Sequence, residues 1–300
     1  MRENDDNTIL KLALAVGLLF AAGPGFATEI PVSTQTEWAA AKKTVDLPNG
    51  IKLAYSEMGN VEGKPLLLIH GYTDNSRSWS LVAPYLKNHH IYAIDLRGHG
   101  KSSAPECCYT YLDFANDAFL FLEAMKIEQA DVVGHSLGSL AVQMLAAQHP
   151  EKVRKVVLIS STLNTGGGPG TWLWDNIKPL QPPIDPNGKF MTDWYWNPNP
   201  VDERFIKPER EESAAVPIHV WKGVLWGTTT GDLGKISSLI KAPVMIFWGD
   251  QDQLMNAPQQ AKLKAAFPKA RFETFPGAGH NMFWERPEKA AELINSFLSE

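Results

Sequence analysis

The sequence predicts an α/β protein with a mostly parallel, doubly wound sheet and an inserted, mainly helical cap. Continuous apolar runs at residues 65–69, 91–94 and 156–159 indicate strands that are buried on both faces, as in a parallel sheet. These runs alternate with helical patterns, which is typical of doubly wound folds with right-handed crossovers. The alternation stops between Ser161 and about Ile236, where no clear buried strand is found. We therefore predict one core with a cap inserted into it.

The individual elements follow from local patterns. A short helix is expected around Trp38, and the turn Pro48-Asn49-Gly50 between two alternating apolar stretches predicts a hairpin. Apolar residues near one face predict a helix at 111–125, and Pro287 marks the first turn of a closing helix over 287–298. The other expected elements are strands at 132–133, 244–247 and 271–275 and a helix at 258–266. The core then comprises residues 28–161 and 237–300, and the cap residues 162–236.

Composition and charge restrict the class of protein. The chain has 300 residues, of which 44% are hydrophobic and 20% are charged, as in globular proteins. Its formal net charge of -5 argues against a nucleic-acid partner, which needs a basic surface, so we expect a small-molecule substrate as the partner. The only 2 cysteines are the neighbours Cys107 and Cys108. A bond between them would close a small strained ring, and we therefore expect a reduced pair.

The N-terminus predicts a targeting segment. Residues 12–22 are apolar, and the small residues Gly25 and Ala27 fit cleavage after Ala27. The run is shorter than the roughly 20 apolar residues of a membrane span. We interpret residues 1–27 as a secretory signal peptide and expect a periplasmic or secreted protein without stable membrane association. The acidic residues Glu3, Asp5 and Asp6 are atypical of such a signal, so an uncleaved N-terminal membrane anchor is the alternative.

One short motif indicates nucleophilic chemistry. Gly134-His135-Ser136-Leu137-Gly138 stands between an apolar strand pattern and a helical pattern. Strand, Gly-x-Ser-x-Gly and helix is the context of a nucleophile elbow, which exposes the serine hydroxyl at the edge of the sheet. Glycines two residues before and after the serine avoid collisions in so sharp a turn. The serine also lies at a helix N-terminus, where free N–H groups stabilise an oxyanion. The alternative is a Gly/Ser loop that only packs a helix against a strand.

A nucleophilic serine needs a general base, and the base needs an orienting acid. Of the 8 histidines, His280 follows a predicted strand through a Gly-rich loop, and such loops collect ligand chemistry in open α/β sheets. The strand before residue 249 is followed by two carboxylates, Asp250 and Asp252. We favour Asp252, which lies further round the loop and can turn towards His280. Asp250 is expected to hold the turn.

The oxyanion hole and the substrate pocket complete the expected site. The two oxyanion donors are expected to be the backbone N–H groups of Leu137, directly after the nucleophile, and of Tyr72, in the loop after strand 65–69. The cap contains six of the 10 tryptophans, and we expect one or two of them to line the pocket while the others pack the cap. They are Trp172, Trp174, Trp194, Trp196, Trp221 and Trp226. The sequence implies no metal or organic cofactor, since it has no thiolate cluster and no His-x-x-x-His helix.

Five segments form one pattern in the order Ser, Asp, His along the chain. They are His70-Gly71-Tyr72, Asp95-Leu96-Arg97-Gly98-His99-Gly100-Lys101-Ser102, Gly134-His135-Ser136-Leu137-Gly138, Gly249-Asp250-Gln251-Asp252 and Gly277-Ala278-Gly279-His280. In this pattern the chain resembles the α/β-hydrolase superfamily. The resemblance implies a cap where the Trp-rich insertion falls, and its Gly-x-x-Asp pattern supports Asp252. It sets the chain apart from haloalkane dehalogenases and epoxide hydrolases, which carry Asp where Ser136 stands. The segment from Asp95 to Ser102 is expected to be a structural turn, with Asp95 and Arg97 paired nearby.

These observations combine into one interpretation, a secreted serine hydrolase of carboxylic esters or lactones with a medium-sized apolar or aromatic substrate. Ser136 attacks the carbonyl and forms an acyl-enzyme, His280 acts as general base and then acid, and Asp252 fixes the His280 tautomer. Two alternatives use the same triad, a C–C bond hydrolase of ring-cleavage products and a cofactor-free perhydrolase. A third alternative is a small-molecule binding protein on a hydrolase scaffold, although such proteins usually lose the triad.

Overall fold

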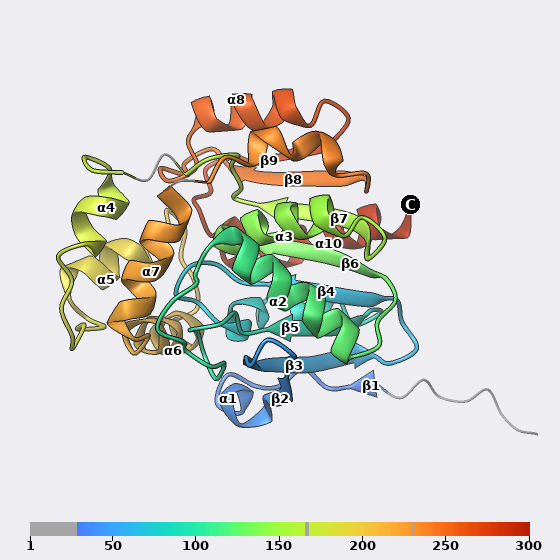
Figure 1. Ribbon diagram of the computed structural model, residues 1–300, viewed down its shortest axis with the longest axis horizontal. Helices are drawn as coiled ribbons and strands as arrows, with labels where there is room; N and C mark the ends of the chain where they lie inside the picture. Colours follow the sequence, from blue (N-terminus) through green and yellow to red (C-terminus); the bar gives the residue numbers. More distant parts are fainter. Residues whose placement is uncertain (1–28, 166–167, 230) are drawn as a thin grey trace, which may run out of the picture.

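The structure is a computed structural model that describes residues 29–165, 168–229 and 231–300. The predicted signal peptide at residues 1–27 and positions 166–167 of the cap lie outside these ranges. The described residues form a nine-stranded sheet with the order β1-β3-β5-β4-β6-β7-β8-β9, in which β2 pairs with β3 (Figure 1). The strands are β1 (Glu29–Ile30), β2 (Lys43–Asp46), β3 (Lys52–Asn60), β4 (Pro65–Ile69), β5 (His90–Ile94), β6 (Ala130–His135), β7 (Val153–Ile159), β8 (Val244–Gly249) and β9 (Arg271–Phe275).

Parallel pairing runs through most of the sheet. From β5 through β4, β6, β7 and β8 to β9 each neighbouring pair is parallel, whereas β3 pairs antiparallel with β1, β2 and β5. Strand β6 is buried along its whole length, as expected of a strand that is covered on both faces. The mostly parallel α/β fold predicted from the sequence is therefore confirmed. The sequence patterns missed the short strand β1 and the outer residues of β6.

The register of the strands aligns their carboxyl ends. Ile69 of β4 pairs with Gly134 of β6, and Gly249 of β8 pairs with Phe275 of β9. The loops that begin at residues 70, 136, 160, 250 and 276 therefore leave the sheet at the same edge. This is the edge at which open α/β sheets bind their ligands.

Some of the core helices begin at residues that suit a helix N-terminus. The hydroxyl of Thr110 and the carboxylate of Asp113 form a capping box at the start of α2 (Tyr111–Ala124). Helix α10 (Pro287–Ser299) has proline in its first turn, where the missing N–H has no partner to lose. The other core helices are α1 (Trp38–Ala41), α3 (Leu137–Gln148), α8 (Ala257–Ala266) and α9 (Met282–Glu285), with 3-10 turns at Ser76–Trp79, Ala83–Tyr85 and Ser237–Leu239. A further 3-10 turn, Leu233–Lys235, lies at the end of the predicted cap.

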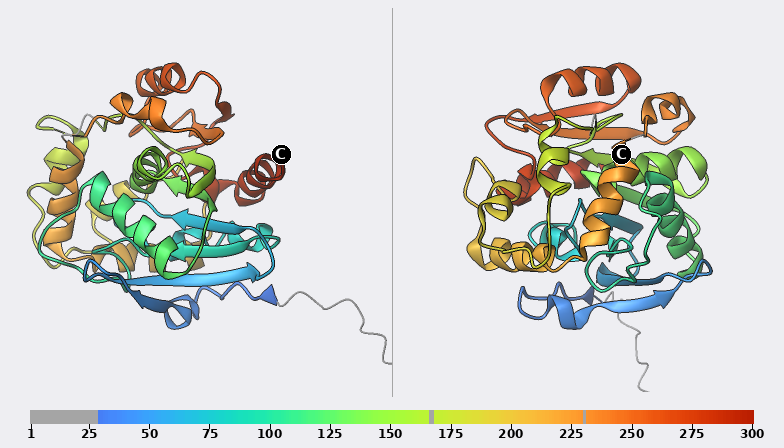
Figure 2. Two further views of the ribbon diagram at one scale, coloured as in Figure 1. Left: turned by 45° about the vertical axis from the view of Figure 1, so that its right-hand side comes forward. Right: turned by 60° about the vertical axis from the view of Figure 1, so that its left-hand side comes forward.

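Four further helices lie between β7 and β8. They are α4 (Trp172–Ile177), α5 (Lys189–Trp194), α6 (Glu203–Ala214) and α7 (Ile218–Thr229). Figures 1 and 2 show these helices gathered at one end of the sheet. The described residues between 162 and 236 contain no strand. This arrangement fits a mainly helical cap, while the boundaries 161/162 and 236/237 stay a prediction.

The two cysteines differ from the sequence expectation. Cys107 and Cys108 are joined by a disulfide, so the expected reduced pair is wrong. The chain turns sharply at Cys108, whose φ is 75°, and this backbone brings the two sulfur atoms together. The guanidinium of Arg97 donates a hydrogen bond to the carbonyl of Cys108 at 3.1 Å, which holds the turn in place.

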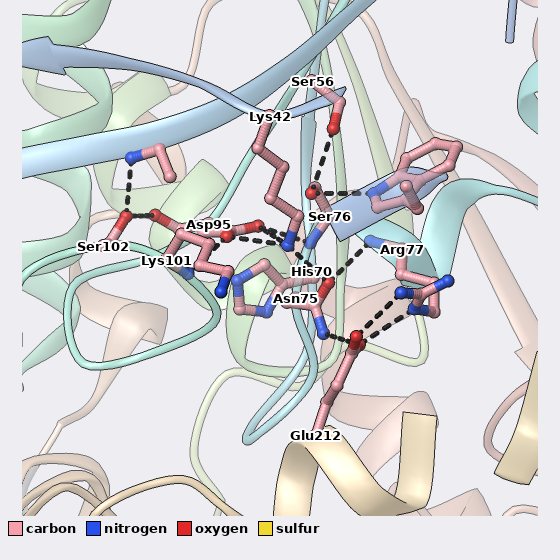
Figure 3. A network of polar contacts seen from close by, with 12 residues as sticks. Lys42, Ser56, His70, Asn75, Ser76, Arg77, Asp95, Lys101, Ser102 and Glu212 are labelled. Atoms are coloured by element: carbon pink, nitrogen blue, oxygen red, sulfur yellow. Dashed lines mark hydrogen bonds and ion pairs between the residues drawn. The ribbon is translucent and has the colours of Figure 1, made fainter. Parts of the chain in front are cut away.

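A buried polar network joins the N-terminal segment, the core and the cap (Figure 3). The carboxylate of Asp95 is fully buried and lies 2.9 Å from Lys42 Nζ, and it also accepts backbone hydrogen bonds from Ser76 and Lys101 at 2.8 Å. Asn75 bridges the two halves of the network. Its Oδ1 accepts from Lys42 Nζ at 2.8 Å, and its Nδ2 donates at 2.7 Å to a cap carboxylate, that of Glu212.

Glu212, on α6, is the cap's ion-pair partner in this network. Its carboxylate receives both Nε and Nη2 of Arg77, at 2.9 and 2.7 Å. Asp95 and Arg97 were expected to be paired nearby, but each has a partner from a different element. Asp95 binds Lys42, and Arg97 binds Asp117 of α2 at 2.5 Å. Such partners are set by tertiary packing, which the local charge pattern does not reveal.

The Lys42–Asp95 pair yields a stability prediction. Replacing Lys42 by methionine leaves a buried carboxylate without its cation, so we expect Lys42→Met to lower the free energy of unfolding by about 3 kcal/mol. The matched control is Lys43→Met, because the Lys43 side chain is 54% exposed in its pair with Glu57 and its loss is expected to cost less than about 1 kcal/mol. Urea unfolding of both variants checks this, and equal midpoints contradict it.

Candidate active site

Ser136 lies in a sharp turn between β6 and α3. Its φ of 49° is a backbone conformation that residues with side chains rarely adopt. A Cβ on Gly134 would lie 2.4 Å from the carbonyl oxygen of Gly138, and a Cβ on Gly138 would lie 2.2 Å from that of Ile69. Only glycine fits at either position. This is the geometry of a nucleophile elbow, with the serine side chain raised at the carboxyl edge of the sheet.

His280 is paired with a buried carboxylate. Its Nδ1 lies 2.9 Å from Asp252 Oδ2, and Asp252 is 4% exposed. The other oxygen, Oδ1, accepts hydrogen bonds from the backbone N–H groups of Leu254 and Met255, each at 2.9 Å. Burial raises the pKa of Asp252, but His280 and these N–H groups outweigh burial and hold the pKa below its ordinary value. An ionised Asp252 keeps the proton on His280 Nδ1 and leaves Nε2 as the basic nitrogen.

The loop that carries His280 is held from several sides. Asp250, the other candidate acid, is exposed and accepts a hydrogen bond from the Gly277 N–H at 2.7 Å, so it supports this loop without contacting the imidazole. The carbonyl of His280 accepts the hydroxyl of Ser160 at 2.5 Å and lies 3.3 Å from Nε2 of His135. Ser160 is a positioning residue that sequence reasoning missed. Its positive φ of 48° is not signalled by any sequence pattern.

The two expected oxyanion donors flank the serine. Leu137 is the first residue of α3, so its N–H has no partner within the helix. Tyr72 lies in the loop after β4, and both residues line the pocket that contains Ser136. Gly71 lets this loop lie against His135, since a Cβ at that position would lie 2.8 Å from Nδ1 of His135. Leu137 and Tyr72 thus share one pocket with Ser136, and their role as oxyanion donors stays a prediction.

His70 supports this loop from inside the core. It is fully buried, its Nε2 accepts the N–H of Leu96 at 2.9 Å, and its Nδ1 donates to the carbonyl of Gly71 at 2.7 Å. Burial, and then the neighbouring His99, lower the pKa of His70 to about 3. The imidazole is therefore neutral, with its proton on Nδ1, and it serves to fix the loop.

Ser136 and His280 line one pocket between the core and the cap. The wall is mainly apolar and comes from several elements. Such a lining is typical of small-molecule sites. The aliphatic and thioether part of the wall consists of Leu137, Leu140, Leu173, Leu225, Leu254 and Met255. The polar part is small, and within the described residues the lining contains neither Lys nor Arg.

The six cap tryptophans have different environments. Among the described residues, only Trp194 of the six lines this pocket. Trp172 stacks with Trp194 at 6.0 Å between ring centroids, and Trp221, which is wholly buried, packs on Trp194 at 5.3 Å. The remaining three pack elsewhere or face solvent, with Trp174 against Trp226 and Trp196 half exposed. Most of these tryptophans thus build the cap or lie at its surface.

Several lining residues were missed by sequence reasoning. Trp284 lies four residues after His280 and is carried into the pocket by α9. Asp74 follows the His70-Gly71 motif, and its proximity to that motif was the one available signal. Tyr195 lies beside Trp194 in the cap, and no motif or periodicity distinguishes it. Its place depends on the folding of the cap onto the core.

Over residues 29–165, 168–229 and 231–300, no group of three or more His, Cys, Asp or Glu side chains is arranged to hold a metal ion. In the same ranges no helix has both the length and the hydropathy needed to span a membrane.

Comparison with known proteins identifies the family. A family model described as "Alpha/beta hydrolase family" matches residues 66–293. The chain belongs to the alpha/beta hydrolase family. A lipase of Psychrobacter immobilis, Lipase 1, is 27% identical to this hydrolase over 274 residues, which cover 86% of this chain and 84% of the lipase.

Two further similarities cover nearly the whole length of the compared proteins. The 2-hydroxy-6-oxononadienedioate/2-hydroxy-6-oxononatrienedioate hydrolase of Paraburkholderia phymatum is 26% identical over 290 residues, covering 89% of this chain and 98% of that enzyme. The crystal structure of a hydrolase from Pseudomonas aeruginosa superposes with a TM-score of 0.75 at 24% identity, covering 86% of this chain and 98% of that one. The structural similarity supports the fold, and the family shows that the protein is a hydrolase.

The buried His70 makes the stability of this hydrolase sensitive to acid. Between pH 6.5 and about 3 the unfolded chain binds a proton at His70 that the folded protein does not. The free energy of unfolding therefore decreases as the pH is lowered. From pH 7 to 5 we expect His70 to contribute a loss of about 2 kcal/mol. His70→Gln, which keeps an acceptor for Leu96 N–H, should lose less stability over this range. Urea unfolding of both proteins at pH 7 and 5 checks this, and parallel losses contradict it.

Proposed function

We propose that this protein hydrolyses carboxylic esters, including lactones, through an acyl-enzyme on Ser136. The observation that carries the proposal is the pairing of the buried Asp252 with His280, which lines the same pocket as Ser136 at the N-terminus of α3. A nucleophile, a base, an orienting acid and free backbone N–H groups are the parts that acyl transfer requires.

The proposed reaction uses these groups in two halves. Ser136 Oγ attacks the carbonyl carbon as its proton passes to His280 Nε2, and the N–H groups of Leu137 and Tyr72 stabilise the oxyanion. His280 then gives that proton to the leaving alcohol, and the acyl group stays on the serine. Water attacks the acyl-enzyme with His280 as base, and collapse of the second oxyanion releases the acid and restores the hydroxyl. Asp252 holds the imidazole in the required tautomer throughout.

The apolar wall of the pocket supports a medium-sized, mainly apolar substrate. Lipase 1 is a relative whose name indicates ester chemistry. The second candidate is C–C bond hydrolysis by the same triad, which the 26% identity to the Paraburkholderia phymatum hydrolase favours. That enzyme is named for a dioate, which carries two carboxylates. The described lining has Asp74 and neither Lys nor Arg, so we favour an ester over a dianionic substrate.

We also propose, from the N-terminal sequence alone, that the protein acts in the periplasm or outside the cell. The binding-protein alternative is disfavoured because an ion-paired, buried Asp252 at 2.9 Å from His280 is a costly arrangement for a site without chemistry.

Turnover of an ester panel tests the proposed function. We expect the protein from residue 28 to cleave at least one of three classes, aryl esters, alkyl esters and lactones. Ser136→Ala should lose essentially all of this activity, because the nucleophile is missing. The measurement is the initial rate for each class with both proteins. Binding without turnover by the unsubstituted protein would refute the assignment and favour the binding-protein alternative.

The two neighbouring aspartates provide a matched comparison. Asp252→Asn removes the anion that fixes the His280 tautomer, and we expect kcat to fall about ten-thousandfold. Asp250→Asn changes only an exposed loop contact and should keep kcat within about threefold, as surface substitutions away from a site usually do. Steady-state kinetics on the best ester of the panel, with circular dichroism to verify folding, distinguishes them. Similar losses in both variants contradict the role given to Asp252.

A further inference from the structure

Asp74 is a buried carboxylate in the wall of the pocket. It lies in the loop after β4, is 4% exposed, and lines the same pocket as Ser136. Its Oδ1 accepts a hydrogen bond from the hydroxyl of Tyr195 at 2.8 Å. A carboxylate has about four acceptor positions, so one phenol leaves most of them unused. Among the described residues Oδ2 accepts no hydrogen bond.

His135 does not supply the missing donor. Its Nδ1 lies 3.8 Å from Asp74 Oδ2, beyond hydrogen-bond distance, and Nδ1 has no other partner among the described residues. Its Nε2 lies 3.3 Å from the carbonyl of His280, which only accepts, so Nε2 carries the proton. Burial lowers the pKa of His135, which keeps the ring neutral. In this tautomer Nδ1 is an acceptor, and it faces another acceptor in Asp74.

Glu209, on the cap side of Asp74, does not supply the missing donor either. Glu209 of α6 is fully buried, and neither of its carboxyl oxygens has a hydrogen-bond partner among the described residues. Burial, and then the nearby Asp74 and Glu212, raise the pKa of Glu209 well above its ordinary value, which favours the protonated carboxyl group, but this group makes no hydrogen bond to Asp74. The pocket also lacks Lys and Arg in its described lining. Asp74 is therefore a buried acceptor whose Oδ2 has no hydrogen-bond donor among the described residues.

We propose that Asp74 determines specificity by binding a hydrogen-bond donor, a hydroxyl or an amine, that the substrate carries near its scissile ester. The rest of the substrate contacts the apolar wall. The substrate class is thus an ester or lactone of a mainly apolar compound that bears an O–H or N–H group. This inference rests on the proposed ester hydrolysis and narrows it to a substrate class. A site with buried polar groups rejects analogues that leave those groups unpaired, so donor recognition can be strongly selective.

Matched esters test this inference. Each set has three members that differ in the substituent at one carbon, which is hydrogen, hydroxyl or methoxy. The methoxy group is included because its oxygen is an acceptor and it has no donor. One series varies the acyl part and another varies the alcohol part, with the substituent at successive carbons. We expect the hydroxy member of at least one set to exceed its methoxy partner about tenfold in kcat/KM.

Asp74→Asn provides the matched variant. The Tyr195 hydroxyl still has the amide oxygen as acceptor, and this bond turns the amide nitrogen towards the position of Oδ2. The pocket then presents a donor in place of an acceptor, so the hydroxy preference should vanish or turn into a methoxy preference. Tyr195→Phe leaves the carboxylate in place and should keep the hydroxy preference. The unsubstituted ester reports whether each variant is folded and has a working triad.

The outcomes separate the two proposals. Equal rates for hydroxy, methoxy and unsubstituted esters in both series mean that solvent occupies the subsite, which overturns the inference and leaves ester hydrolysis intact. A hydroxy preference that persists in Asp74→Asn overturns the role of Asp74. If Asp74→Asn turns over no ester, the hydroxy-to-methoxy ratio of the unsubstituted protein and of Tyr195→Phe still decides the donor subsite. If the unsubstituted protein cleaves no ester at all, both proposals fall.

Discussion

The site depends on the close approach of α3 to the ends of β4 and β6. Gly134 lies against the carbonyl of Gly138, and Gly138 lies against the carbonyl of Ile69, so neither has room for a Cβ. Because helix and strand meet this closely, the residue between them must take the positive φ of Ser136. The sheet holds it there, since the Ser136 N–H donates to Ile159 O at 2.9 Å. The height of the nucleophile and the direction of the first N–H groups of α3 both follow from this contact.

The parallel register of the strands brings the other residues of the candidate site to Ser136. Strands that end together place their loops together, so the loop after β8 brings Asp252 to the loop after β9, which carries His280. The loop after β7 contributes Ser160, which holds the His280 carbonyl, and the loop after β4 contributes Tyr72. In the chain, at least one helix and one strand separate each of these loops from the next. The sheet is the common frame that gives their side chains a fixed separation.

Those features whose cause is local were predictable from the sequence, and those whose cause is tertiary were not. Burial on both faces leaves a continuous apolar run in the strand itself, and the elbow requires its glycines at fixed spacing. By contrast, Trp194 has the same local signature as the other cap tryptophans, and its place at the pocket depends on tertiary contacts such as its packing against Tyr72, with 5.4 Å between ring centroids. Lys42, the partner of Asp95, lies 53 residues away in the chain, and the Cys108 turn depends on a positive φ that no pattern signals.

The loop after β4 contacts both the cap and the pocket that contains Ser136. Tyr72, the proposed second oxyanion donor, lines the pocket and contacts α7 through its hydroxyl, which donates to the carbonyl of Trp221. Thr73, with a φ of 66°, accepts Trp194 Nε1 at 3.1 Å and the Ser213 hydroxyl at 2.7 Å, so α5 and α6 are fixed to the same loop. A shift of the cap therefore displaces the backbone that faces the nucleophile. Since oxyanion stabilisation depends on N–H groups held in place before the reaction, the proposed role of Tyr72 implies that the cap contributes to catalysis through this loop as well as to the shape of the pocket.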